Sequence, residues 1–384
     1  MTPSSPDEYG ADVSWSDWLA EQAASREAAG LTRRLRSRGP DDAVVDLAGN
    51  DYLGLSRDER VVRAAADAAL TWGGGAGASR LVTGTLDLHT ELEAELAEHL
   101  GQPAALTFST GYHANLAVVT ALVDRDCHVI SDAHIHASLV DAVRLSRAGL
   151  TVVPHSDVEA VEDALSRGGG ERTLVLAESI YSVLGDAAPL AELAEVCHRH
   201  GALLVVDEAH GLGVHGPGLV ARAGLAGHPS LVVTATLSKA LGSQGGAVLG
   251  SADLVDHLVN RARPFIFDTG LAPAAAAAAL AALRIVRDEP QWAELVRTRV
   301  GDLAAALGVT PPAGAVLSVP MPSPQTAVAA QAAALDAGVR VGCFRPPSVP
   351  DGVSRLRITG TAGVAADDWE RAVEVLLRVV KEHQ

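Results

Sequence analysis

Two residues that suit covalent amine chemistry follow short apolar runs. Lys239 comes just after the run 231–236 and before a glycine; burial there would lower the lysine pKa and free its amine for Schiff-base formation. Asp207 ends the run 203–207, where a buried carboxylate needs a cationic or hydrogen-bonding partner, such as a protonated ring nitrogen. Taken singly, Lys239 could be a surface lysine and Asp207 a helix cap. Together, with His210 between them, they are far more specific.

The elements that would position these residues alternate, over residues 60–250, between short apolar runs and segments of helical length. The runs are 105–108, 128–131, 151–154, 174–177, 203–207 and 231–236. They are short and rich in Val and Leu, as expected of strands buried on both faces of a mostly parallel sheet. The intervening segments imply βαβ crossovers. Ligands of such sheets bind beyond the carboxyl ends of the strands, where this sequence is polar.

The chain outside this region divides into two further parts. Residues 15–35 have the pattern of an amphipathic helix that ends in a basic run, 33–38. An alanine-rich stretch, 272–287, predicts a long connecting helix. The strands expected after it are 315–321, 339–344 and 355–359, and the helices are 327–337 and 366–382. We therefore expect an N-terminal helical segment (1–50), a large domain (51–270), and a linker helix with a smaller α/β domain (271–384).

Seven motifs along the chain resemble those of one enzyme family. They are residues 50–55, 75–80, 109–112, 136–139, 207–213, 236–246 and 355–359, in the family's order over nearly the whole chain. The spacing of Asp207, His210 and Lys239 resembles that of fold-type I pyridoxal-phosphate enzymes, and the full set resembles the α-oxoamine synthases. These join an amino acid to an acyl-CoA and release carbon dioxide. The resemblance implies an α/β fold, a transferase activity, pyridoxal 5'-phosphate (PLP) as cofactor, and a homodimer with its site at the subunit interface.

The resemblance also implies three catalytic residues. Lys239 would bind the cofactor aldehyde and then act as general base at the substrate Cα. Asp207 would keep the pyridine nitrogen protonated. His136 would stack on the cofactor ring and polarise or protonate the thioester oxygen.

Further cofactor contacts follow from the same motifs. Gly111 and Tyr112, at a helix N-terminus, match the phosphate-binding pair, since backbone N–H groups there suit a dianion. Thr236 would add a hydroxyl to the same phosphate. Ser182 and His210 match the groups beside the ring oxygen.

Substrate contacts are expected from His136 and from four further residues. Arg357 matches the arginine whose planar fork binds the amino-acid carboxylate. Arg33 and Ser348 match positions that contact the acyl substrate, and a terminal carboxylate on that substrate would need a cation such as Arg33. Asn50 is assigned to the substrate site and, with Thr269, is expected near the partner's cofactor.

The segment 345–350 and the arginine-rich N-terminal helix resemble the branch of the family that uses L-alanine and pimeloyl-CoA in biotin biosynthesis. The alternatives are a glycine- or serine-using synthase, such as 2-amino-3-ketobutyrate CoA ligase, or a non-catalytic subunit, which would have no need of Lys239. Leu184 and Ala78 depart from the family pattern, where Asp and Gly are usual. Neither departure removes a group that the chemistry requires.

Composition excludes several other classes. Thirty basic and 47 acidic residues give a net charge of −17, which opposes binding to nucleic acid and to anionic membranes. Three cysteines without a CxxC motif argue against a disulfide framework or a cysteine zinc site. Residues 1–10 lack the features of a secretory signal, and no apolar run is long enough to span a bilayer. A cytoplasmic protein is expected.

The alternating pair His134 and His136 would, on an extended segment, point the same way, as half of a metal site does. No carboxylate–histidine cluster at metal-ligand spacing accompanies the pair. We therefore expect no metal.

Overall fold

The computed structural model describes residues 14–29, 31–33, 35–346, 349 and 351–384, and it separates into two compact units, residues 1–43 and 44–384. The first unit contains helix α1 (Trp15–Ala28), whose N-cap Ser14 accepts the Asp17 N–H. The predicted extension of this helix to residue 35 is wrong. A glycine and then the β-branched Thr32 follow Ala29 in the sequence, and both residue types weaken helices.

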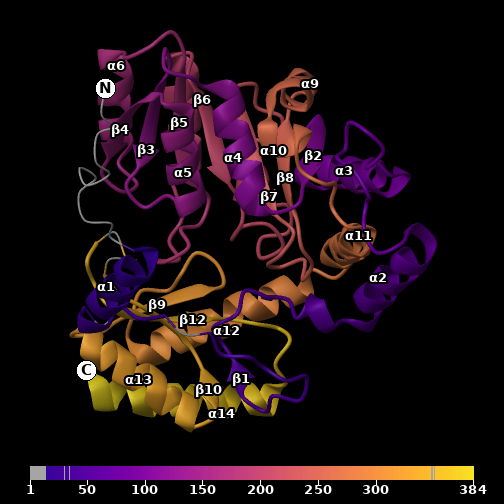
Figure 1. Ribbon diagram of the computed structural model, residues 1–384. Helices are drawn as coiled ribbons and strands as arrows, with labels where there is room; N and C mark the ends of the chain where they lie inside the picture. The colour runs from indigo at the N-terminus through magenta and orange to yellow at the C-terminus, as the bar shows by residue number, and fades with distance from the viewer. Residues whose placement is uncertain (1–13, 30, 34, 347–348, 350) are drawn as a thin grey trace, which may run out of the picture. The chain divides into compact units, whose positions relative to one another are not determined.

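A seven-stranded sheet forms the centre of the second unit, in the order β2-β8-β7-β6-β5-β3-β4 (Figure 1). The strands are β2 (Ala104–Phe108), β3 (His128–Asp132), β4 (Gly149–Val153), β5 (Thr173–Glu178), β6 (Leu203–Asp207), β7 (Leu231–Thr236) and β8 (Gly246–Gly250). Strands β4, β3, β5, β6 and β7 pair in parallel, whereas β8 is antiparallel to both β7 and β2. The predicted mostly parallel sheet is confirmed. Strand β8 was not predicted, because its three apolar residues are enclosed by glycines.

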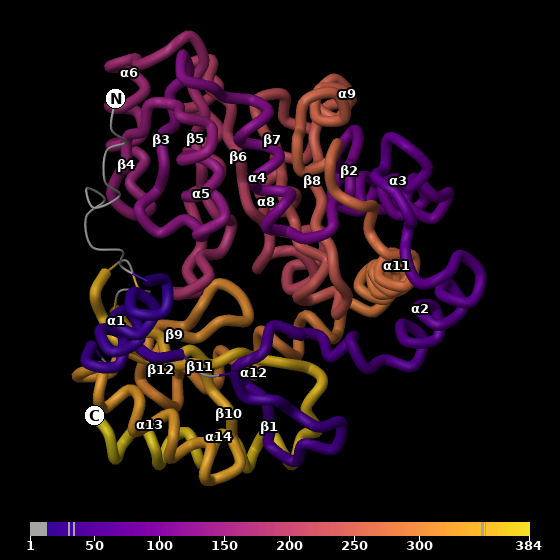
Figure 2. Tube along the Cα trace, in the orientation of Figure 1, coloured from indigo at the N-terminus to yellow at the C-terminus, as the bar shows by residue number. Residues whose placement is uncertain are grey.

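Helices cover both faces of this sheet, which explains why its strands are continuously apolar. Alternate residues of one strand enter different cores: Leu204 and Val206 pack in one, and Val205 in the other. The helices on the Val205 side are α4 (Gly111–Leu122), α5 (Ala137–Ser146), α9 (Ala252–Arg261) and α10 (Arg263–Ile266). The other core includes α2 (Glu59–Trp72), α3 (Asp87–Leu100), α6 (Val158–Arg167), α7 (Leu190–Arg199), α8 (Leu219–Arg222) and α11 (Pro273–Asp288). Helix α11 packs on α2 and α3, and Figure 2 shows the three helices next to one another.

The segment after α11 forms a second, smaller α/β layer. Strands β11 (Gly342–Phe344), β12 (Arg355–Thr359) and β9 (Val316–Pro320) form an antiparallel sheet, and β1 (Val45–Asp46) pairs with β10 (Val339–Arg340). They share a core with α12 (Gln291–Leu307), α13 (Pro324–Asp336) and α14 (Ala366–His383). The single strand predicted over 339–344 is two strands, and α12 was not predicted. The division at residues 50 and 270 stays a prediction.

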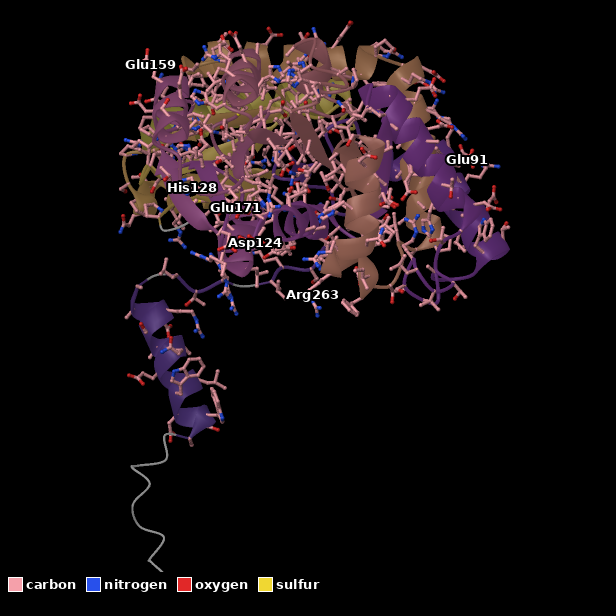
Figure 3. The ribbon with its side chains drawn as sticks, turned by 90° about the horizontal axis from the view of Figure 1, so that it is seen from above. Glu91, Asp124, His128, Glu159, Glu171 and Arg263 are labelled. Carbon is pink, nitrogen blue, oxygen red and sulfur yellow. The ribbon has the colours of Figure 1, made fainter. Side chains whose placement is uncertain are left out.

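The two ends of the central sheet differ in chemistry. At the amino ends of β3 and β5, the preceding loops place Asp124 and Glu171 at the surface, and His128, the first residue of β3, lies close to them (Figure 3). At the carboxyl ends, a short 3-10 helix, η1 (Leu55–Arg57), follows the polar segment 50–52 that reaches the site described below. Across the part of the chain that the structure describes, none of the helices has both the length and the apolar character needed to cross a membrane.

Candidate active site

Lys239 lies in the turn that follows β7 and begins a chain of three hydrogen bonds. Its Nζ is 2.9 Å from His210 Nε2, and His210 Nδ1 is 2.7 Å from the Tyr52 hydroxyl. The Tyr52 hydroxyl donates to Asn50 Oδ1 at 3.1 Å. For Tyr52 to donate onward, His210 must donate from Nδ1 and accept from Lys239 at Nε2. The chain of bonds therefore fixes the tautomer of His210 and orients the Lys239 amine.

Burial sets the protonation states along this chain. It lowers the pKa of Lys239 to about 8; the carboxylates of Asp207 and Glu178 oppose this change, and the Arg357 charge adds to it. Burial, together with the charges of Lys239 and Arg357, lowers the pKa of His210 well below its usual value. His210 is therefore neutral. Burial also raises the pKa of Tyr52 to about 12, so its hydroxyl keeps the proton that it donates.

Asp207, at the end of β6, is buried and firmly held. Its Oδ1 accepts the Ala209 N–H at 2.9 Å, and its Oδ2 accepts from Asn115 Nδ2 at 2.8 Å. Asn115 Nδ2 also lies 2.9 Å from Ser138 Oγ, whereas Asn115 Oδ1 is buried and has no protein partner. Asn115 thus fixes the carboxylate and leaves a polar atom for another group. Its role was not anticipated from the sequence.

Glu178 is a second acid that sequence reasoning missed. It ends β5 directly opposite Asp207, and only 2% of it is exposed. Burial and the charge of Asp207 raise its pKa well above the usual value. Its Oε2 accepts the Ser182 N–H at 3.1 Å, and its Oε1 is buried with no protein partner. The signal was available, since Glu178 ends its apolar strand as Asp207 does.

The N-terminus of α4 forms a narrow backbone cradle beside these acids. Gly111 is the first residue of α4, and a Cβ added there would lie 3.0 Å from Thr236 Cβ. A Cβ on Gly246 would lie 2.5 Å from Gly111 Cα, so the backbones approach closely. Thr236 Oγ1 is 2.7 Å from Ser238 Oγ, and the adjoining Tyr112 hydroxyl donates to Asp141 Oδ2 at 2.6 Å. The helix N-terminus and the neighbouring hydroxyls of Thr236 and Ser238 suit a phosphate dianion.

His136 lies near enough to Asp207 and Lys239 for their charges to act on it. It is the N-cap of α5, its Nδ1 is 2.8 Å from Ser138 Oγ, and the residue is exposed. Desolvation lowers the pKa of His136. The charge of Lys239 lowers it further, whereas the charge of Asp207 opposes the change. His134 does not point the same way, because β3 ends at Asp132 and a turn follows. Its ring instead stacks on His155, with centroids 4.0 Å apart.

Arg357 extends from β12 toward the same site. Its Nε donates to the Ser182 carbonyl at 2.8 Å, and its Nη2 donates to Asn50 Oδ1 at 3.2 Å. Only 5% of Arg357 is exposed, and its charge acts on both Lys239 and His210. Residues from the two sheets thus meet in one site that holds a reactive amine, a carboxylate and a guanidinium.

A sequence profile described as aminotransferase class I and II matches residues 42–376, a span that includes Asp207, Lys239 and Arg357. The chain belongs to the class I and II aminotransferase family.

Individual members of the family resemble the chain over nearly its full length. Proteins named 8-amino-7-oxononanoate synthase from Mycolicibacterium smegmatis and Mycobacterium tuberculosis are 55% and 54% identical to it, each over 94% of this chain, and over 96% and 95% of their own length. A solved serine palmitoyltransferase from Sphingomonas wittichii has a TM-score of 0.88 at 29% identity, covering 97% of this chain and 99% of that one. One from S. paucimobilis, solved with bound PLP, has a TM-score of 0.87 at 28% identity, covering 95% and 97%.

PLP is the cofactor of this aminotransferase-family fold, and the residues present fit it. The Gly111 cradle suits the phosphate, and Lys239 offers an amine of lowered pKa for the aldehyde. Asp207 is a buried acidic group that can pair with a protonated ring nitrogen. The unpartnered atoms Asn115 Oδ1 and Glu178 Oε1 lie among these groups and leave polar capacity for a ligand.

Other predicted site residues lie elsewhere or outside the description. Arg33 belongs to the unit 1–43, and Ser348 lies outside the described residues. Thr269 is exposed and forms an isolated bridge with Ser79. Within the described part of the chain, no group of three or more His, Cys, Asp or Glu side chains could hold a metal ion.

Proposed function

We propose that the protein is an 8-amino-7-oxononanoate synthase, which condenses L-alanine with a pimeloyl thioester in biotin biosynthesis. The identity of 55% over 94% of the chain with a relative of that name supports this most strongly. The serine palmitoyltransferases share the fold, but at only 28–29% identity they are more distant. The activity is that of a PLP-dependent acyltransferase.

PLP bound at Lys239 supplies an electron sink for negative charge at the amino-acid Cα. Arg357 binds the substrate carboxylate with its guanidinium fork, while Asp207 holds the proton on the cofactor's ring nitrogen. Lys239 would hold the cofactor through its aldehyde, and the Lys239 amine, once free, would take the substrate Cα proton as general base. His210 accepts a hydrogen bond from that amine and keeps it oriented.

The new bond joins the alanine Cα to the thioester carbonyl carbon, and the thiol leaves as free CoA. His136 is exposed and lies within reach of the charges of Lys239 and Asp207, and it hydrogen-bonds the thioester oxygen as charge develops there. The alanine carboxylate leaves as carbon dioxide, and Lys239 returns a proton to Cα. Arg33 and Ser348 are proposed to contact the acyl chain, with Arg33 at its distal carboxylate.

The active form is proposed to be a homodimer in the cytoplasm. Gly111, Tyr112, Thr236 and Ser182 contact the cofactor in each subunit, and Thr269 lies near the partner's cofactor. The large domain (51–270) binds the cofactor, and the segment 271–384 supplies Arg357.

Release of CoA thiol by the cofactor-loaded protein tests this proposal. L-alanine, glycine and L-serine are each paired with pimeloyl-CoA and with a short-chain acyl-CoA. We expect release only with L-alanine and pimeloyl-CoA. Release only with glycine or serine, or only with the short chain, would overturn the assignment while leaving the Lys239 chemistry intact. No release with any pair, despite a bound cofactor, would indicate a non-catalytic subunit.

A further inference from the structure

A histidine outside the site lies between two carboxylates. His155, in the turn after β4, is 3.0 Å from Asp132 Oδ1 through its Nδ1, and 2.8 Å from Asp186 Oδ2 through its Nε2. The His155 side chain is 19% exposed and that of Asp132 is 8% exposed. The end of β3 and the connections after β4 and β5 are therefore joined at one imidazole.

The surroundings hold the His155 ring in place. His134 stacks on one side of it, and Tyr181 meets it edge to face at 4.3 Å between centroids. The next residue, Ser156, has a φ of 55°, in the left-handed region that side chains other than glycine rarely adopt. Its N–H donates to Asp132 Oδ2 at 2.7 Å, so the strained turn and the ion pair share one carboxylate. Backbone strain of this kind persists only where surrounding contacts enforce it.

The loop that Asp186 ends leads back to the active site. The Asp186 carbonyl accepts the Tyr181 N–H, and the Tyr181 carbonyl accepts the Gly185 N–H, both at 2.9 Å. Gly185 has a φ of 79°, and a Cβ there would lie 2.0 Å from the Val316 carbonyl, so the loop is pressed against β9. Inside this closed loop, Ser182 accepts the Arg357 Nε–H bond through its carbonyl. Movement of Asp186 would therefore shift the carbonyl that orients Arg357.

We propose that His155 is a positioning residue that fixes the loop 181–186, through Asp186, so that Ser182 holds Arg357 in the orientation that binds the amino-acid carboxylate. This inference rests on the proposed role of Arg357. His155 touches neither substrate nor cofactor in this arrangement and acts only through the loop.

Charge supports the geometry. Partial burial alone would lower the pKa of His155, but the hydrogen bonds to Asp132 and Asp186 outweigh burial and raise the pKa to about 9. His155 is then a cation at neutral pH and donates from both ring nitrogens. The other ionisable groups near it are His134, Tyr181 and, acting on His134, Asp351.

The test compares the holoenzyme with His155→Gln, Asp186→Asn and the double variant. Each single change should raise KM for L-alanine about tenfold, with little change in kcat or in KM for the acyl thioester, because only Arg357 is disturbed. The double variant should be no worse than His155→Gln alone, since both substitutions act on the same contact between His155 and Asp186. His198→Gln, an exposed histidine bonded to Ser230, is the control and should match the wild type.

A second readout does not depend on activity. Hydrogen exchange at the Tyr181 and Gly185 amides should accelerate in His155→Gln and Asp186→Asn but not in His198→Gln. Unchanged exchange, additive effects of the two substitutions, or an equal rise in KM for both substrates would overturn the proposal. If the wild type proves inactive with L-alanine, the proposed function fails, while the exchange comparison still decides whether His155 holds the loop.

Discussion

The reactivity of Lys239 depends on opposing influences on one amine. Burial lowers its pKa to about 8. The charges of Asp207 and Glu178 act to raise the pKa, and the charge of Arg357 acts to lower it. A lysine with an ordinary pKa would be almost wholly protonated at neutral pH and unable to attack an aldehyde. At this position a useful fraction of the amine is neutral, and the neutral His210 accepts its hydrogen bond.

Cofactor attachment should therefore depend on pH in a defined way. The rate at which the apo-protein gains the visible absorption of the lysine-bound cofactor should rise about tenfold per pH unit below about pH 8, and level off above it. The rise follows the neutral fraction of Lys239. Rapid-mixing absorbance over a pH series measures this rate, with Lys239→Ala as the control that shows no attachment. A pH-independent rate would refute the assigned lysine state.

Arg357→Lys should separate charge from geometry. Lysine keeps the positive charge but loses the planar fork and the bond to the Ser182 carbonyl. KM for L-alanine should rise by about tenfold or more, in line with the loss of a charge-assisted hydrogen bond. Steady-state kinetics check this, with Arg371→Lys, an exposed pair partner of Asp368, as the matched control. An unchanged KM would remove Arg357 from the carboxylate site.

At the scale of elements, parallel register brings the site together. Strands β5 and β6 place Glu178 opposite Asp207, and β6 and β7 place Asp207 opposite Thr234, two residues before Thr236. Apolar packing on both faces of these strands keeps the register fixed. Polar groups can therefore extend only from the strand ends, where the cofactor-binding residues gather.

The ion pair of His155 makes the joined loops sensitive to pH. Its folded-state pKa of about 9 lies above the unfolded value of 6.5, so its stabilisation is complete below about pH 6.5 and is lost as pH rises through about 9. The difference in unfolding free energy between wild type and His155→Gln should be on the order of 2–3 kcal/mol near pH 6 and small near pH 10. Chemical denaturation across this range measures the difference. A difference that grows with pH would contradict a protonated His155.

The sequence predicted the strands with long Val and Leu runs, and the positions of Lys239, Asp207 and His210 after them. It did not predict the bonds that set their chemistry, because Asn115 and Tyr52 reach Asp207 and His210 from distant parts of the chain. The raised pKa of Glu178 depends on burial and on the charge of Asp207, and no local sequence pattern reports either of them. The predicted direction of the His134 side chain was wrong because the backbone turns after β3.

For the whole molecule, the exposed apolar side chains favour the proposed dimer. Trp72, Leu81, Val82 and Phe267 are exposed by 41%, 50%, 74% and 69% in segments that flank Arg80 and Thr269. Light scattering of the wild type should give the mass of two chains, and Val82→Glu should shift the population toward the monomer with loss of activity, since it places a charge in the interface. Val62→Glu, at an exposed position on α2, is the control. A fully active wild-type monomer would contradict the dimer.

The central claim is a decarboxylative condensation at Lys239, and the fate of the alanine carboxyl carbon tests it most directly. With L-alanine labelled at that carbon and pimeloyl-CoA as partner, labelled carbon dioxide and free thiol should appear in equal amounts, and neither should form with Lys239→Ala. Label at Cα should remain in the product. Thiol release without labelled carbon dioxide, or equal turnover by Lys239→Ala, would contradict the mechanism.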